Sequence, residues 1–130
     1  MRFMFLIISA FLAFISGCSS VEEPIFKEGF VTEVFLVNHK EYDIAAKIQL
    51  KFGDGMAEEK TKQIYQIVRP VVLEIIKMES PSWSVPDLDY FSQNHLIFGM
   101  KFCEVLKSQI ISEGKGYQIQ GCKMLELSRP

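Results

Sequence analysis

The sequence predicts an α+β domain in which an antiparallel sheet of about three strands carries two helices on one face, in the order β-β-α-α-β. Three observations lead to this fold class. Apolar and polar residues alternate between residues 42 and 52, apolar residues recur every three or four positions in two later stretches, and a last alternating stretch closes the chain. Because alternation buries one face of a strand and solvates the other, it is typical of antiparallel sheets.

The first 17 residues have the organisation of a secretory signal peptide. Met1 and Arg2 precede an apolar run from Phe3 to Ile15, and small residues follow the run. The run has 13 residues. A membrane-spanning helix needs roughly 20 apolar residues to cross the hydrocarbon layer. We therefore expect residues 1–17 to be a cleaved targeting segment and not a retained membrane span.

The residues that end this segment, Ile15-Ser16-Gly17-Cys18, resemble the lipobox of bacterial lipoproteins. The resemblance implies that the thiol of Cys18 receives a diacylglyceryl group, that the chain is cut before Cys18 and that the new amine is acylated. Each buried methylene of such chains contributes about 0.8 kcal/mol to membrane binding. In Gram-negative lipoproteins an aspartate after the cysteine favours inner-membrane retention, but Ser19 stands here. The resemblance thus implies the periplasmic face of the outer membrane; a plain signal peptide is the alternative.

Cleavage would leave one small domain. Residues 18–130 number 113, enough to bury about two-thirds of the unfolded surface in one core. Without Arg2 the chain has 13 basic and 16 acidic residues, a formal charge of −3. Nucleic-acid-binding domains carry a basic stripe, so we expect no nucleic-acid partner. We expect residues 18–28 to be the lipidated cysteine and a polar linker, and residues 29–130 to be the domain.

Two strands are expected at the start of the domain. Residues 30–37 are mostly β-branched or aromatic, which favours an extended backbone. After a polar stretch at residues 38–41, six apolar residues occupy every second position over 11 residues. The pattern predicts a second strand and a hairpin with the first. The six residues are Tyr42, Ile44, Ala46, Ile48, Leu50 and Phe52.

A helix is expected after Gly53-Asp54-Gly55. Asp54 offers a carboxylate for its N-cap, and Glu58 and Glu59 suit the positive end of its dipole. Pro70 lies inside the apolar stripe and removes one backbone donor, which predicts either a kink or a second helix that starts there. The stripe comprises Ile64, Ile67, Val68, Val71, Val72, Ile75 and Ile76.

Residues 80–86, with two prolines, predict a loop before a second helix at about residues 87–112. Trp83 in this loop either covers the core or anchors a partner, since exposed tryptophan is enriched at interface hot spots. The second helix is more apolar than a surface helix needs to be. Either it is packed between the sheet and the first helix, or part of its surface, including Phe98 and Phe102, is kept for a partner or a lipid.

Near the end of the chain, Gly114 is expected to end the helix in the left-handed backbone conformation. A last strand is expected at residues 117–127, with a bulge at Gly121. Cys103 and Cys122 would share an oxidising compartment after export. They either form a disulfide, which stabilises by roughly 3 kcal/mol in the chain-entropy model, or are two separately buried thiols. The spacing alone leaves both alternatives open.

The sequence contains no convincing catalytic, metal or nucleotide site. His39 and His95 are far apart in the chain and have no carboxylate or cysteine at ligand spacing. Gly114-Lys115-Gly116 lacks the glycine pattern of a phosphate loop. We therefore expect no cofactor, no metal and no enzymatic activity.

Parts of the chain resemble the periplasmic domain of the FliL family, flagellar proteins that associate with the stator and carry a stomatin-like fold. The resemblance spans residues 31–127 and rests on Asp43-Ile44-Ala45-Ala46-Lys47-Ile48-Gln49-Leu50, on Ile67-Val68-Arg69-Pro70-Val71-Val72-Leu73-Glu74-Ile75-Ile76 and on Ser80. It implies a strand, an Arg-containing aliphatic helix, a loop with a serine, a second helix and a closing strand.

These observations favour a non-catalytic lipoprotein that serves as an accessory or assembly subunit of an envelope machine, of flagellar or secretion type, and binds a partner protein. A pilotin, which carries a secretin to the outer membrane, is the first alternative. A carrier of a lipid or another apolar ligand is the second, because the second helix has excess apolar surface.

Overall fold

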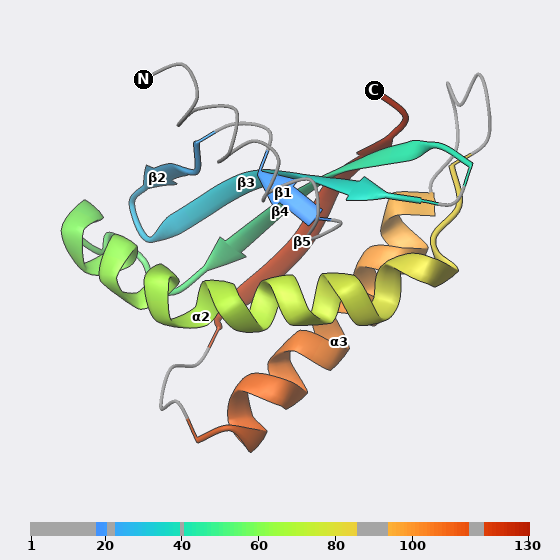
Figure 1. Ribbon diagram of the computed structural model, residues 1–130. Helices are drawn as coiled ribbons and strands as arrows, with labels where there is room; N and C mark the ends of the chain where they lie inside the picture. The colour runs from blue at the N-terminus through green and yellow to red at the C-terminus, as the bar shows by residue number, and fades with distance from the viewer. Residues whose placement is uncertain (1–17, 21–22, 40, 86–93, 115–118) are drawn as a thin grey trace, which may run out of the picture.

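The computed structural model describes residues 18–20, 23–39, 41–85, 94–114 and 119–130 (Figure 1). It confirms an α+β fold with an antiparallel sheet and two long helices, α2 and α3, that lie on the same side of the sheet in Figure 1. The elements in chain order are β1 (Cys18–Ser20), β2 (Ile25–Lys27), β3 (Phe30–Asn38), β4 (Asp43–Lys51), α2 (Glu58–Glu79), the 3₁₀ turn η1 (Ser80–Ser82), α3 (Asn94–Ser112) and β5 (Gly121–Ser128).

The sheet has five strands, where about three were expected. The three long strands β3, β4 and β5 lie side by side in that order, and the two short strands β1 and β2 both pair with the outer side of β3. All the pairings are antiparallel. One edge of the sheet is therefore formed by β1 and β2, and the opposite edge is formed by β5.

The expected linker of residues 18–28 carries β1 and β2, which corrects that interpretation. Cys18 pairs with Val37 in β1, and Lys27 pairs with Phe30 in β2. The second pairing leaves a two-residue turn, Glu28-Gly29, in which both residues have positive φ (49° and 87°). This conformation matches the right-handed twist of a two-residue hairpin. Residues 18–20 and 25–27 are thus part of the sheet.

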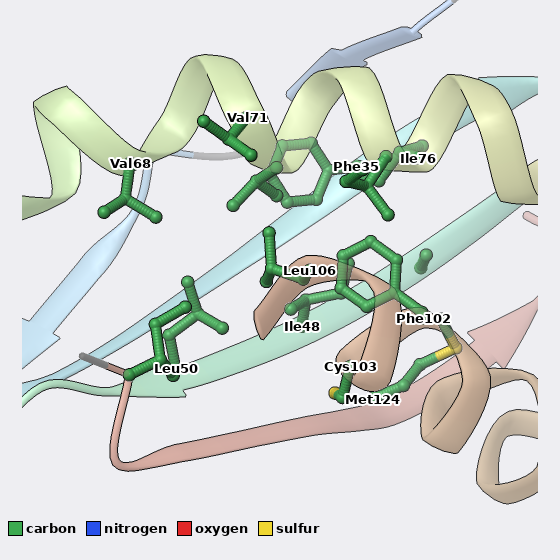
Figure 2. Packing of buried hydrophobic residues seen from close by; sticks show 14 of the residues in the cluster. Phe35, Ile48, Leu50, Val68, Val71, Ile76, Phe102, Cys103, Leu106 and Met124 are labelled. Atoms are coloured by element: carbon green, nitrogen blue, oxygen red, sulfur yellow. The ribbon is translucent and has the colours of Figure 1, made fainter. Parts of the chain in front are cut away.

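The core lies between one face of the sheet and the two helices. Alternate residues of β3 and β4 point into it, and for β4 the alternation in the sequence predicted this inner face correctly. Figure 2 shows Phe35, Ile48 and Leu50 of the sheet below Val71 of α2. The inner residues of these two strands are Val31, Glu33, Phe35, Val37, Ile44, Ala46, Ile48 and Leu50.

Helix α2 is one helix of 22 residues that runs through Pro70, so no second helix begins there. Pro70 is exposed, and the buried stripe around it packs onto the sheet and offsets the lost hydrogen bond. Ala57 is the N-cap residue and no side chain caps it. Asp54, which was expected there, instead pairs with Lys51 at 2.6 Å. Glu58 and Glu59 lie in the first turn as expected.

Helix α3 is described from Asn94, so the start expected at residue 87 lies outside the described residues. Its inner face carries Phe102 and Leu106, which Figure 2 shows between α2 and the sheet. The helix ends at Ser112, and Gly114 has the positive φ (61°) that was predicted for it.

The last strand differs from its prediction. β5 begins at Gly121 and not at Tyr117, which lies outside the described residues, and its irregularity falls opposite Lys47 and Ile48, not at Gly121. Met124 pairs with Ile48, and Glu126 pairs with Lys47. Leu125 is therefore the extra residue of a β-bulge. The bulge shifts the alternation by one residue, which is why Met124 and Leu127 both face the core.

Candidate binding groove beside helix α3

Two of the three aromatic residues considered for partner binding belong to the core. Trp83 is 2% exposed and lies edge-on to Phe102 with ring centroids 6.2 Å apart, and Phe102 is fully buried. Phe98 is partly buried and packs against the same core. Trp83 thus covers the core, which is one of its two alternatives, and Phe102 is part of the core. Phe98 is only half-buried, so a partner contact at this residue stays a prediction.

The exposed apolar side chains of α3 lie elsewhere, on its outer face. Leu96, Ile97 and Met100 occupy the first two turns of the described helix and are 49%, 67% and 73% exposed. Ile111, near the end of the helix, is also exposed, but its neighbours Lys107 and Ser108 are polar and exposed. The first turns of α3 therefore present a continuous apolar surface, which monomeric proteins seldom leave uncovered without a reason.

A groove lies next to this surface, between α3 and β5. Its volume is about 230 Å³, and it is open to solvent. Most of its walls are apolar, with one lysine at the rim. It is smaller than the roughly 300–1,000 Å³ of pockets that enclose a small molecule, so it suits one or two protruding apolar side chains better than a whole ligand. Its lining residues are His95, Leu96, Gly99, Met100, Lys123, Met124 and Leu125.

The groove exists because α3 approaches β5 closely. A Cβ atom on Gly99 would lie 2.7 Å from Cβ of Met124, a distance that real contacts do not reach, so only glycine allows this approach. One turn further along the helix, Cys103 is joined to Cys122 of β5 by a disulfide, with the two Cα atoms 5.7 Å apart. The structure thus places the two cysteines in the bonded arrangement, one of the two alternatives that the spacing left open. The close approach at Gly99 and the disulfide at Cys103 thus hold α3 against β5 at two neighbouring points beside the groove.

Strand β5 forms the other wall and is an edge strand, because β4 is its only pairing partner among the described residues. Edge strands can accept an added strand, but bulges and charged residues prevent this. β5 has both, since Leu125 is bulged and the flanking Lys123 and Glu126 are exposed. We therefore expect a ligand to contact the groove through side chains and not to extend the sheet.

A buried polar cluster lies on the other side of the core. Glu33 of β3 is 2% exposed, and its carboxylate accepts hydrogen bonds from Arg69 Nη2 at 2.7 Å and from the Tyr65 hydroxyl. Burial, together with the Glu33 carboxylate, raises the pKa of Tyr65 well above its usual value near 10. Bonding to the same carboxylate raises the pKa of Arg69. The paired charges fasten α2 to the sheet, and Glu33 lines neither the groove beside α3 nor the hollow beside β2.

A third set of contacts lies at the end of the β3–β4 hairpin. The Tyr42 hydroxyl accepts a hydrogen bond from the backbone N–H of Val85 at 3.0 Å. Arg129 Nε donates to the Val85 carbonyl at 2.6 Å, and its guanidinium lies 3.5 Å from the Tyr42 ring centroid. The ring of His39 stacks on Tyr42 with centroids 4.9 Å apart. These contacts tie the hairpin to the loop after α2 and to the C-terminus.

Other parts of the described chain offer less for a ligand. A second hollow, between β2 and the start of α2, is lined partly by the charged residues Glu23, Glu58 and Lys62. No group of three or more His, Cys, Asp and Glu residues in the described ranges could hold a metal ion. No helix there has both the length and the apolar character needed to cross a membrane.

Comparisons with protein-family models, with curated proteins and with solved structures gave no match for this chain.

The residues of the groove were partly missed by the sequence interpretation. It named Phe98 and Phe102 as candidate partner-binding residues of the helix, whereas the groove is lined by Leu96 and Met100. The signal that could have separated them is Gly99, an isolated glycine in a helix of large apolar residues. It marks where the helix meets the sheet and so places Leu96 and Met100 beside the contact.

Proposed function

We propose that this protein is a lipid-anchored, non-catalytic accessory or assembly subunit of a cell-envelope machine, which binds a partner protein through the groove between α3 and β5. The observation that carries the proposal is the exposed apolar surface of Leu96, Ile97 and Met100 beside an open apolar groove. Folding does not require these three side chains, because they lie outside the core. Surfaces of this kind on small proteins mark sites of interaction.

The anchor in this proposal is the acylated Cys18, and its place is the periplasmic face of the outer membrane. This part rests on the lipobox-like residues Ile15-Ser16-Gly17-Cys18 and on Ser19 after them. A flagellar machine agrees with the resemblance to the FliL domain, whereas a secretin would make the protein a pilotin. Both are protein partners and both would present apolar side chains to the groove.

The experiment is site-specific photo-crosslinking in cells. A photoreactive residue in place of Met100 is expected to give an adduct of one discrete protein mass, because this side chain is 73% exposed at the groove. The matched position is Ile111, which is 71% exposed on the same helix but does not line the groove. It is expected to give no adduct. An adduct at both positions or at neither would contradict a protein site in the groove.

The same pair of positions supplies matched variants. Met100→Glu should abolish the adduct formed from a photoreactive residue at Leu125, whereas Ile111→Glu should leave it, because only the first places a charge in an apolar groove. Both side chains are exposed, so both variants should fold with stability changed by less than about 0.5 kcal/mol. An adduct with lipid and not with protein would favour the carrier function instead.

A further inference from the structure

The backbone of Cys18 lies within the sheet and not at the end of a free linker. β1 pairs Cys18 with Val37, Ser19 with Leu36 and Ser20 with Phe35. Cys18, which carries the lipid in the proposed function, is therefore paired in register with β3, and no spacer separates it from the folded domain. Acyl chains on Cys18 would leave the domain from one defined point.

That point lies at one end of the sheet, the end with the β3–β4 hairpin. Val37, the partner of Cys18, is the residue before the last of β3, and it pairs across to Ile44, the second residue of β4. Ser128, the last residue of β5, pairs with Ala45 at the same end. Figure 1 also shows the first described turn of α3 near this hairpin. Cys18, the hairpin and the C-terminus thus share one end of the molecule.

The opposite end of the sheet is far from Cys18. β3 has nine residues, and a strand rises about 3.3 Å per residue, so its two ends are roughly 26 Å apart. The far end carries the turn at Glu28-Gly29 and the turn at Gly53-Asp54. A fixed anchor at one end of a body this long would give the domain a definite orientation on a membrane.

The hairpin end is suited to contact with lipid headgroups. It is held rigid by the bonds among Tyr42, Val85 and Arg129 described above. Tyrosine and arginine both combine an apolar body with a polar tip, which suits the boundary between hydrocarbon and water. The exposed carboxylates of Glu41 and Asp43 lie at the same end, so attraction to anionic lipids is not the driving force. The acyl chains of Cys18 bind the domain to the membrane, and they bring the hairpin end into contact with the headgroups because Cys18 lies at that end.

We propose that the domain sits on the bilayer that holds its own acyl chains with the β3–β4 hairpin end against the headgroups and the turn at Asp54 pointing away. The proposal rests on the lipidation of Cys18 in the proposed function. It deepens that function, because β5 forms the sheet edge opposite to β1. The groove beside β5 then opens sideways along the membrane, toward a partner that stands in or on the same bilayer.

The test uses the full lipidated protein in vesicles of phosphatidylethanolamine and phosphatidylglycerol that contain a lipid with a nitroxide on its headgroup. A fluorophore is attached to a cysteine introduced as Glu41→Cys at the hairpin or as Asp54→Cys at the far turn. Both residues are exposed. Cys103 and Cys122 are held in the disulfide, and in the lipidated protein the thiol of Cys18 carries the diacylglyceryl group. We expect strong quenching at position 41 and none at position 54, because nitroxide quenching acts only at short range.

A flexible insertion provides the control. About eight Gly and Ser residues between Ser19 and Ser20 would add a coil of roughly 16 Å and remove Cys18 and Ser19 from their pairing with β3. This variant should still float with the vesicles but should lose the difference between positions 41 and 54.

The two proposals can fail separately. Equal quenching at the two positions in the native sequence would overturn the orientation while leaving the anchor intact. Protein that does not float with vesicles would overturn both the anchor and the orientation. A difference that survives the insertion would show that β1 does not set the orientation, and it would overturn the proposal as well.

Discussion

The two long helices pack on the same face of the sheet, but they differ in what their outer surfaces carry. α2 buries its whole apolar stripe apart from Ile67, and a bidentate ion pair between Arg69 and Glu33 ties it to β3. α3 is tied to β5 by the disulfide from Cys103, yet it leaves four large apolar side chains exposed, at Leu96, Ile97, Met100 and Ile111.

This difference separates the side chains that folding requires from those that it does not require. The residues of α2 are accounted for by the core, the polar cluster and a solvated outer face, apart from the exposed Ile67 and Met78. In α3 only the inner face is accounted for in this way. The outer apolar residues of α3 gain little from burial, which supports the proposal that they contact a partner. Three predictions test the contrast, from the largest expected effect to the smallest.

The two faces of α3 should respond very differently to truncation. Phe102→Ala removes a fully buried ring that α3 places between α2 and the sheet, edge-on to Trp83. It should lower the free energy of unfolding by about 4 kcal/mol. Ile97→Ala on the outer face should change it by less than about 0.5 kcal/mol. Urea unfolding followed by tryptophan fluorescence measures both, since Trp83 is the only tryptophan. Similar losses in the two variants would remove the distinction between the faces.

The disulfide should stabilise α3 more than α2. It joins residues 19 apart in the sequence, which corresponds to about 3 kcal/mol of unfolding free energy in the chain-entropy model. Replacing both Cys103 and Cys122 by alanine, or adding a reductant, should produce this loss in guanidinium unfolding. Hydrogen exchange should then increase in α3 and β5 while α2 keeps its protection. If a reductant leaves the unfolding curve of the native protein unchanged, the bond does not form.

The polar cluster under α2 should make stability depend on alkaline pH. The pKa of Tyr65 is raised in the folded protein, chiefly by burial, whereas the unfolded chain loses this proton near pH 10. Its contribution is complete below about pH 10 and is lost as the pH rises further, because only the unfolded state then releases the proton. Tyr65→Phe should cost about 1.5 kcal/mol at neutral pH through the lost bond to Glu33.

The same variant should weaken the decline in stability above about pH 10, as followed by urea unfolding at several pH values. It keeps the ring that contacts Phe26 and Phe52, so the packing on either side of it provides an internal control. If the native protein and Tyr65→Phe lose stability equally at high pH, another group causes the decline.

The parts of the fold that were predicted from sequence are those in which a periodic pattern of apolar residues extends over ten residues or more. The alternation from Tyr42 to Phe52 located β4 to within a residue at each end, and the stripe that ends at Ile76 located α2. The general arrangement of a sheet with two helices followed from these signals. Gly114 was placed correctly because the end of a helix has a specific need for positive φ.

The parts that were missed are short or depend on contacts distant in sequence. β1 and β2 have three residues each, too few to show a period, although Glu28-Gly29 between apolar stretches was a usable turn signal. The bulge at Leu125 is set by pairing with β4, which no local pattern reveals. The groove depends on where α3 crosses β5, so the exposed residues of α3 could not be separated from the buried ones.

The pairing of β1 with β3 has a practical consequence for handling the protein. A soluble form that begins at Glu23 would keep β2 but would uncover the outer edge of β3 at residues 35–37. These residues, Phe35, Leu36 and Val37, are apolar, and their unpaired backbone groups would be free to accept a strand from another copy. Such a form would be prone to self-association, whereas in a form that retains residues 18–20 the strand β1 would keep this edge of β3 paired.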